Sequence, residues 1–392
     1  MLTHLFRLIW NKKKQNFLLI LEIFLSFIGL CAAFTFVLYP YNNYKLPAGL
    51  QHENVWVVNY NSADEIKSID SLQIFRESVK KVLLSMNQVQ DVTYCSGNIP
   101  FSGNSSNTDI KHNGNEIFAN VYSVEDSYLN ILGMKVLEGR WFNSDDDVSK
   151  DRPVVINDAF KKKLFGDADA IGKIVGSDAS NRMKIVGVVA AFKHESEFEM
   201  PSPGFFQRMD TSEMRYNNTM MIKVKPGADA AFESTVYKTL SNTMMNANIE
   251  IQHLTDMKAT KNKAMLVPFI IFVVIAGFLI INVALGIFGV LWYTIHKRRG
   301  EIGLRRAVGA TGRAISWQLV VEAVLIATLA LVIGSLFAIQ FPLLNLLDLP
   351  SENYITAIIY AILFIYVLVI LCAVYPGKQA AGIYPATALH ED

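Results

Sequence analysis

Four stretches of the sequence are apolar over roughly the 20 residues that a helix needs to cross a bilayer. They cover about residues 17–39, 266–293, 316–347 and 354–375. Hydrophobic residues make up 52% of the chain and charged residues only 18%, which favours a membrane protein over a soluble one of this size. The sequence therefore predicts four transmembrane helices, and an even number places both termini on the same side of the membrane.

Positive charge indicates which side that is. Lysines and arginines gather at residues 7–14 and at 297–313, whereas the 348–353 connection has two acidic residues and no cation. By the positive-inside rule, both termini and the 296–315 loop are cytoplasmic. The first apolar stretch is too long for the core of a signal peptide, so we interpret it as a retained span. Residues 1–16 before it are predicted to form an amphipathic helix at the membrane surface, the alternative being an unstructured tail.

Residues 40–262 then face outward, and they are numerous enough to fold into one or two modules. Strand, helix and strand patterns follow one another over 55–60, 72–86 and 92–95, and again over 221–226, 228–245 and 249–254. The two ends of the region are predicted to pair into one α+β module. The middle, about 101–216, reads as a β-rich insertion. The predicted fold is an α-helical membrane protein with four spans and a large α+β extracytoplasmic domain between the first and second.

Several motifs that would indicate an enzyme are incomplete. Residues 166–174 resemble a phosphate-binding loop, but five residues separate the glycines where four are required, and Ile174 replaces the Ser or Thr that would hold magnesium. The run Asp145, Asp146, Asp147 lacks the glycine and glutamate of a calcium loop, which favours a solvated turn. His194 and Glu195 lack the second histidine of a zinc protease. We therefore predict no enzymatic activity, cofactor or metal for this chain.

The placement of cysteines and basic residues excludes two further classes. Cys31 and Cys372 lie in apolar stretches, so the large polar region has only Cys95 and no internal disulfide. The basic residues stand beside apolar stretches rather than on one surface, which argues against nucleic-acid binding.

Two carboxylates lie inside predicted spans, Glu22 and Glu322, each near the cytoplasmic end. A charge at the centre of the membrane is costly, but the cost falls towards the interface. We favour pairing with the neighbouring lysines and arginines. A proton or substrate site is the alternative.

The basic loop 296–315 contains the segment EIGLRRAVGAT, interrupted by glycines and predicted to form a short interfacial helix. This segment closely resembles the first cytoplasmic loop of the MacB/FtsX-type permeases, which touches the ATPase subunit of an ABC transporter. The resemblance implies that Glu301, Arg305 and Arg306 make polar contacts with the ATPase. The residues that it assigns to coupling are Glu301, Ile302, Gly303, Leu304, Arg305, Arg306, Ala307, Val308, Gly309, Ala310 and Thr311. The apolar residues of the segment would pack into a groove of the ATPase; these are Ile302, Leu304, Ala307 and Val308. The alternative is a cationic helix that only anchors the third span.

Other segments resemble the same family. Three segments resemble the extracytoplasmic domain of MacB-like permeases in sequence and in order; they are residues 132–147, 153–175 and 184–203. The glycines there, Gly133, Gly139, Gly166, Gly172 and Gly187, are read as turn or tight-packing glycines. The last residues, 376–392, resemble the family's ending and are predicted to be a cytoplasmic tail. Pro376 is expected to stop the last helix, at 375.

The resemblance implies a permease subunit in the bacterial inner membrane, paired with a second permease chain, identical or different. ATP and Mg²⁺ would be bound by a separate cytoplasmic ATPase, and a periplasmic adaptor and an outer-membrane channel are further possible partners. ATPase closure would move the outward domain through the helices, with the second span as a lever bent at Pro268 and with Gly286, Gly289 and Gly334 permitting close helix approach. Two alternatives stay open, an FtsX-like regulator of cell-wall hydrolases and a Lol-type permease for lipoprotein release.

Overall fold

The computed structural model describes residues 13–61, 68–112, 114–143, 146, 149–176, 182–244, 247–344 and 349–382, although not the side chains of 13–16. The chain divides into two compact units. We name Met1–Asn42 with Leu266–Asp392 the helix unit, and Asn43–Met265 the sheet unit. Most of the predicted amphipathic helix, 1–12, and the end of the predicted tail, 383–392, lie outside the described residues.

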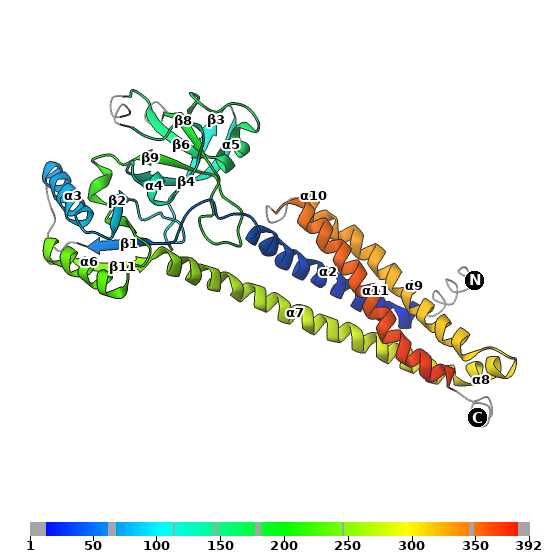
Figure 1. The fold of residues 1–392 in the computed structure, drawn as a ribbon. Helices are drawn as coiled ribbons and strands as arrows, with labels where there is room; N and C mark the ends of the chain where they lie inside the picture. Colours follow the sequence, from blue (N-terminus) through cyan, green and yellow to red (C-terminus); the bar gives the residue numbers. More distant parts are fainter. Residues whose placement is uncertain are drawn as a thin grey trace. The chain divides into compact units, whose positions relative to one another are not determined.

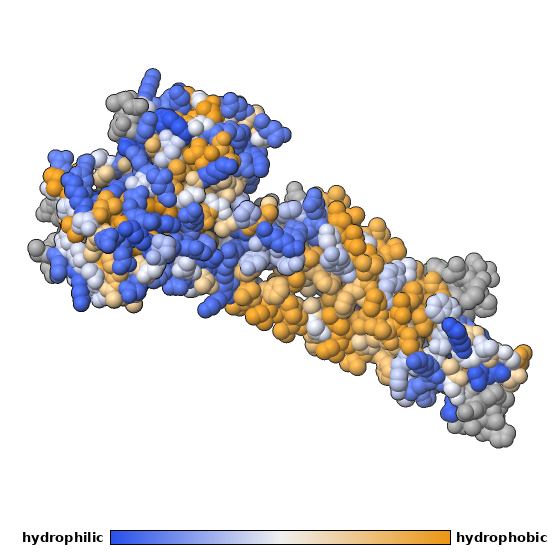
Figure 2. Space-filling model, viewed as in Figure 1, coloured by the Kyte–Doolittle hydropathy of each residue, from blue (hydrophilic) through white to orange (hydrophobic). Residues whose placement is uncertain are grey.

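Four long helices have the length and composition of membrane spans. They are α2 (Lys13–Tyr44), α7 (Leu254–Lys297), α9 (Gly312–Ala338) and α11 (Ser351–Ala381), with the short α10 (Gln340–Leu343) after α9. Apolar side chains cover their surface along most of its length (Figure 2). The four spans predicted from the apolar stretches are therefore present. Three of the helices, α2, α7 and α11, extend beyond the predicted limits at both ends. A helix forms its own backbone hydrogen bonds, so it can continue into water where the sequence is no longer apolar.

The end of α11 corrects the expectation for Pro376. The helix passes through this proline to Ala381, so residues 376–381 are helical rather than part of a tail. The reason is packing. Gly377 lies so close to α9 that an added Cβ would come within 2.6 Å of the Ser316 hydroxyl, and Pro376 is itself buried. Contact with α9 offsets the one backbone hydrogen bond that the proline removes.

One apolar cluster holds α2, α7, α9 and α11 together, and its members include Phe27, Val283, Ala327 and Ile365. Glycines allow two of the close approaches. A Cβ at Gly334 would collide with the Phe27 ring, and one at Gly286 with the Glu22 carboxylate, whereas Gly289 has nothing near it. The prediction of close helix approach is thus confirmed at Gly286 and Gly334 and wrong at Gly289, for which no described neighbour exists.

The sheet unit has eleven strands in its described residues, joined in one sheet (Figure 1). Its first half contains β1 (Val55–Asn61), α3 (Ile69–Leu84), β2 (Val89–Cys95), β10 (Thr219–Val224), α6 (Ala230–Thr243) and β11 (Asn248–His253). The strand order is β11-β1-β10-β2, and β10 is antiparallel to both β1 and β2. The two ends of the region therefore do pair into one module. Because β10 lies between β1 and β2, each βαβ unit is split, as in ferredoxin-like folds.

The second half of the sheet is the β-rich region. It contains β3 (Asn107–His112), β4 (Asn115–Val124), β5 (Val136–Gly139), β6 (Arg152–Asn157), β7 (Ile174–Val175), β8 (Met183–Val189) and β9 (Gly204–Arg208), with helices α4 (Tyr128–Ile131) and α5 (Asp158–Phe165). Within the predicted β-rich insertion, the sequence patterns indicate β4, β5, β6 and β8 but not β3, β7 or β9. The last of these is central, since it pairs in parallel with β4 and antiparallel with β6.

Alternation along β1 divides the core of the first half between two faces. Trp56 and Val58 pack under α3 and α6, whereas Val55 and Val57 pack on the opposite face with aromatic residues that include Tyr122 and Phe206. The predicted turn glycines fit this frame. Gly133, Gly139, Gly166 and Gly172 have positive φ angles, and a Cβ at Gly187 would come within 2.1 Å of the Arg140 carbonyl oxygen.

Asp146 corrects a second expectation, that of a solvated acidic turn. Its carboxylate is buried and accepts two hydrogen bonds from the Arg140 guanidinium, at 2.7 and 2.8 Å, and one from the Asn143 backbone N–H. These hydrogen bonds, mainly the one from Arg140, lower the pKa of the Asp146 carboxyl. The neighbouring Asp145 and Asp147 lie outside the described residues.

His194 generates a pH prediction. The ring is buried against Tyr122, and neither ring nitrogen has a hydrogen-bond partner. Burial and the nearby Lys261 lower its pKa to about 4, while Glu195 opposes the shift. The unfolded chain, with a histidine pKa near 6.5, therefore takes up the proton first as pH falls. Stability is full above about pH 6.5 and decreases towards about pH 4, by on the order of 3 kcal/mol from this group.

Thermal unfolding of the detergent-purified chain at pH 7.5 and 5.0 measures this loss. In His194→Phe the difference between the two pH values should become smaller, because the titrating ring is gone. His296→Asn, which changes an exposed histidine at the end of α7, should keep the difference of the wild type. An unchanged difference in His194→Phe would contradict the assignment.

Candidate coupling site

The basic loop between α7 and α9 contains a short helix, α8 (Arg299–Ala307), as the sequence indicates. Gly309, which has a φ of +102°, ends it, and the backbone N–H of Ala310 donates to the Arg305 carbonyl at 2.9 Å. The Thr311 hydroxyl then caps α9 by accepting from the Ala314 N–H at 3.3 Å. The glycines and the threonine of the segment thus set the limits of α8 and the start of α9.

One face of α8 is packed against its own unit. Ile302 is buried in a small cluster with Ile295 of α7, Ile315 and Leu319 of α9, and Ala380 of α11. Gly303 beside it is also buried. Ile302 is therefore an anchor of α8 within this chain and is not available to pack into a partner, which corrects the role that the resemblance implied for it.

The opposite face is exposed. Leu304 is 56% exposed and Val308 82% exposed, and Glu301, Arg305 and Ala307 are exposed beside them. Arg305 is held along the helix surface by Glu301 and by the side-chain oxygen of Gln318, the latter at 3.0 Å. Arg306 is only half-exposed, and its guanidinium lies next to Gly312. Of the apolar residues assigned to coupling, Leu304, Ala307 and Val308 are the ones that a partner can reach.

Arg298 links α8 to the membrane helices. Its guanidinium lies 3.2 Å from the Glu322 carboxylate of α9 and 3.8 Å from that of Glu301. The predicted pairing of Glu322 with a neighbouring cation is confirmed. For Glu22 it stays a prediction, because its carboxylate lies against Gly286 and the nearest lysine side chains lie outside the described part of the chain.

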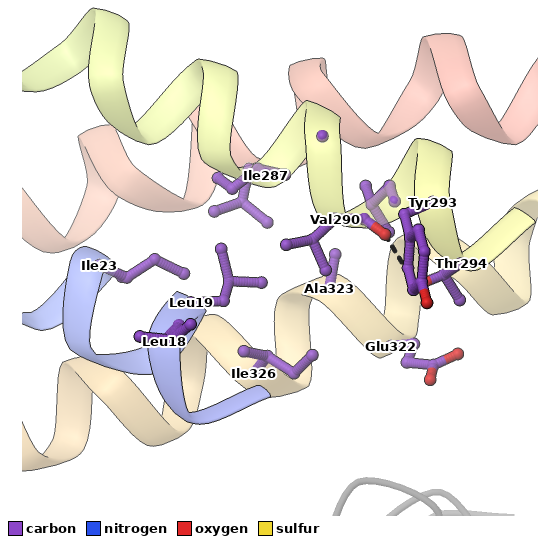
Figure 3. Close-up of a pocket in the computed structure, with 13 residues that line it drawn as sticks. Leu18, Leu19, Ile23, Ile287, Val290, Tyr293, Thr294, Glu322, Ala323 and Ile326 are labelled. Carbon is purple, nitrogen blue, oxygen red and sulfur yellow. Dashed lines mark hydrogen bonds between the residues drawn. The ribbon is translucent and has the colours of Figure 1, made fainter. Parts of the chain in front are cut away.

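A cavity of about 300 Å³ lies between α2, α7, α9 and α11 beside this ion pair. Figure 3 shows Glu322 at one end of it and aliphatic side chains, among them Leu19, Ile23, Ile287 and Ile326, around the rest. Glu322 is the only charged residue among the described residues that line it. Since Arg298 already neutralises this carboxylate, the cavity suits an apolar group such as an acyl chain and gives little support to a proton or substrate site.

The family resemblance assigned residues 301–311 to coupling but gave no role to Arg298 or Gln318. The three-residue spacing of Arg298 and Glu301 does indicate an ion pair on one helical turn. The contacts of Gln318 and Ala380 join residues distant in sequence, and no local pattern indicates them. α8 thus has one face buried in its own unit and one face that another protein can reach.

Two family models match the chain. The model of the MacB-like periplasmic core domain matches residues 27–236, and that of the FtsX-like permease C-terminal domain matches residues 273–385. The second match includes the whole of α8.

Curated proteins give the same result. The chain is 24% identical over 302 residues to the macrolide export ATP-binding/permease protein MacB of Neisseria gonorrhoeae, covering 74% of this chain and 46% of that protein. It is 24% identical to the ABC transporter permease YvrN of Bacillus subtilis, covering 73% of each. The chain thus spans about half the length of the MacB relatives.

Solved structures also resemble it. One is the periplasmic region of MacB from Actinobacillus actinomycetemcomitans, with 18% identity, a TM-score of 0.39, and coverage of 54% of this chain and 94% of that one. Another is the extracellular domain of the transporter YknZ from Gram-positive bacteria, with 15% identity, a TM-score of 0.35, and coverage of 50% and 100%.

The Arg298–Glu322 pair can be tested by hydrogen exchange. Glu322→Ala leaves Arg298, whose side chain is only 14% exposed, without its closer partner and should cost about 1–2 kcal/mol of support for α8. Amides of residues 299–307 should then exchange roughly tenfold faster. Glu352→Ala, which removes an exposed carboxylate from the first turn of α11, should leave α8 unchanged. Equal exchange of α8 in the wild type and in Glu322→Ala would show that the pair does not hold the helix.

Proposed function

Because the chain belongs to the family of ABC transporter permeases that have a MacB-like periplasmic core domain and an FtsX-like permease domain, we propose that α8 docks on a cytoplasmic ABC ATPase. ATP hydrolysis by that ATPase would drive movements of the sheet unit, for export or for mechanical signalling. This chain would supply the membrane path and the outward domain, and the ATPase would bind ATP and Mg²⁺.

The observation that supports docking is the division of α8 into two faces. Ile302 is buried and fixes the helix to α7, α9 and α11, while Leu304 and Val308 expose large apolar surface beside Arg305. Exposed apolar residues rimmed by charge are typical of a surface that a partner covers. A helix with a short apolar stripe fits the groove-binding mode of recognition.

A simple membrane anchor explains this arrangement less well. Anchoring needs an apolar face towards lipid and cations at its edge, and Ile302 would be the natural residue to insert. Ile302 instead packs inside the unit, and Glu301 is exposed beside Leu304 and Arg305. A carboxylate on the exposed face suits a protein partner better than an anionic lipid surface.

The proposed orientation follows from charge. By the positive-inside rule, the cations at 297–313 support a cytoplasmic position for α8, and the sheet unit would then lie on the outer side of the membrane. The second permease chain that this family pairs with would face apolar surface such as that of α7, where Ile270, Val274 and Leu285 are exposed. An adaptor and an outer-membrane channel on the outer side stay predictions.

Docking predicts that a small change on the exposed face separates the two proteins. Leu304→Gln with Val308→Gln keeps the helix and its charge but removes the apolar stripe. Co-purification of the ATPase with the permease should fall at least tenfold, because fully covered apolar side chains contribute about 1.5–3 kcal/mol each. The measurement is the ATPase-to-permease ratio after affinity purification in mild detergent.

The matched control is Ile74→Gln with Tyr216→Gln, two exposed residues of the sheet unit. It makes the same kind of change away from α8 and should leave the ratio as in the wild type. An undiminished ratio for the α8 variant, at normal membrane levels, would disprove docking through this face.

A further inference from the structure

Lys193 is a buried lysine whose charge is satisfied by backbone carbonyls. The side chain is 1% exposed, and its ammonium donates to the carbonyls of Asn43 and Leu46 at 2.7 Å each and of Glu197 at 2.9 Å. An ammonium has three protons, so each is used. Burial lowers the pKa of Lys193, and Glu197 opposes this. A buried charge of this kind is costly unless every partner stays in place.

Two of these carbonyls belong to the end of α2 and the turn after it. Asn43 lies in the last turn of α2, and its side-chain amide in turn donates to the Phe198 carbonyl at 3.1 Å. The Tyr44 ring stacks on Phe198 with centroids 5.5 Å apart. Residues 193–198, between β8 and β9, therefore hold the carboxyl end of α2 from three directions.

The same segment holds the amino end of α7. The Glu197 carboxylate accepts from Lys258 at 3.1 Å and from the Asn262 side chain at 2.8 Å, and the Glu197 backbone N–H donates to Asn262 at 3.1 Å. One turn along, Lys261 donates to Glu195 at 3.0 Å. Lys261 and Asn262 follow Lys258 by three and four residues, so the three side chains lie along one side of α7.

The segment is itself fixed to the sheet. Phe192 just before it is buried in the apolar core, the Lys193 N–H donates to the Ala48 carbonyl at 2.9 Å, and the His194 carbonyl accepts from the Phe101 N–H at 2.6 Å. Residues 193–198 are therefore anchored to the core of the sheet unit and to the segments that contain Ala48 and Phe101, and the chain continues from them into β8 on one side and β9 on the other.

We propose that residues 193–198 are a clamp that joins the end of α2 to the start of α7, and that Lys193 and Glu197 are positioning residues through which the two helices act on the sheet unit. This rests on the proposed function, in which the helices move when the ATPase closes. All the contacts lie within the sheet unit, in Asn43–Met265.

Chain connectivity shows why a clamp is needed. α7 begins at Leu254 directly after β11 ends at His253, and Leu254 and Met257 also pack in the apolar core of the sheet unit. α2 ends at Tyr44, and ten residues separate it from β1, which begins at Val55. Without the clamp, a shift of α2 would be absorbed by the ten residues between α2 and β1. With it, both helices act on β8 and β9 in the second half of the sheet.

The experiment compares hydrogen exchange of the permease with its ATPase, in lipid nanodiscs, without nucleotide and with ATP and vanadate. In the wild type we expect the nucleotide to change exchange in 43–54, in 193–203 and in β8 and β9. Lys193→Met removes the charge but keeps the length of the side chain. In this variant the change should be confined to the first turns of α7 and β11, while the ATPase stays bound and hydrolyses ATP at the wild-type rate.

Glu197→Gln is the second variant, and it decides the matter if Lys193→Met does not fold. It weakens the contact with Lys258 and keeps the shape, so the change in β8 and β9 should fall to less than half of that in the wild type. The matched control is Lys80→Met, which breaks the 3.0 Å pair of Lys80 with Glu125 elsewhere in the sheet unit and should preserve the full response.

Two outcomes would overturn the clamp, and they differ. A full response of β8 and β9 in both clamp variants would show that the helices act on the sheet by another route, while the proposed function stands. If the wild type, with ATPase bound and active, showed no nucleotide-dependent change anywhere in the sheet unit, the proposed movement would be wrong and the clamp with it.

Discussion

The hydrocarbon of a membrane offers no partner to a backbone N–H or C=O, and this constraint organises the chain. Each span must satisfy its own backbone as a helix, so the apolar stretches form α2, α7, α9 and α11. Association of the helices then depends on close fit, because lipid is as apolar as the side chains themselves. The fit is tight at Gly286 against Glu22 and at Gly334 against Phe27.

Charged groups are confined by the same constraint to the ends of the helices, where they hold specific contacts. Arg298 joins Glu322 to Glu301 at one end of α7, and Lys258 meets Glu197 at the other. Both pairs are largely buried, and Arg298, Lys258 and Glu197 each have a further polar partner. Such pairs contribute little to net stability, but removing one member is costly, so they fix geometry more than they add stability.

Elements with a local signal could be predicted from the sequence. The four spans follow from length and hydropathy, and β1 and β10 follow from alternation, since Val55 and Val57 face one core and Trp56 and Val58 the other. β9 was missed because its five residues follow two prolines and pair with strands distant in sequence. Ile302 could be assigned to an apolar face but not to a neighbour, because its burial depends on Ala380 and Ile315.

The polar parts of the helices were the hardest to predict for a related reason. Hydropathy starts the second span near 266, yet α7 begins at Leu254, and its first three turns hold the residues that bind Glu197. The sequence of residues 256–263 is compatible with a helix that continues into the second span, but its pattern does not indicate that this part of α7 binds Glu197.

The length of α7 gives these contacts their significance. At about 1.5 Å per residue, 44 residues extend roughly 66 Å, about twice the hydrocarbon thickness. Ile295 near its last turn packs on Ile302 of α8, and Lys258 near its first turn pairs with Glu197. α7 thus contacts both α8, the proposed docking helix, and residues 193–198, the proposed clamp. Pro268, which lies inside α7, removes one backbone hydrogen bond and makes that turn the most easily bent. Such a helix transmits displacement along its axis better than it transmits bending at Pro268, and an axial pull on α7 is resisted by Glu197, which both Lys258 and Asn262 bind.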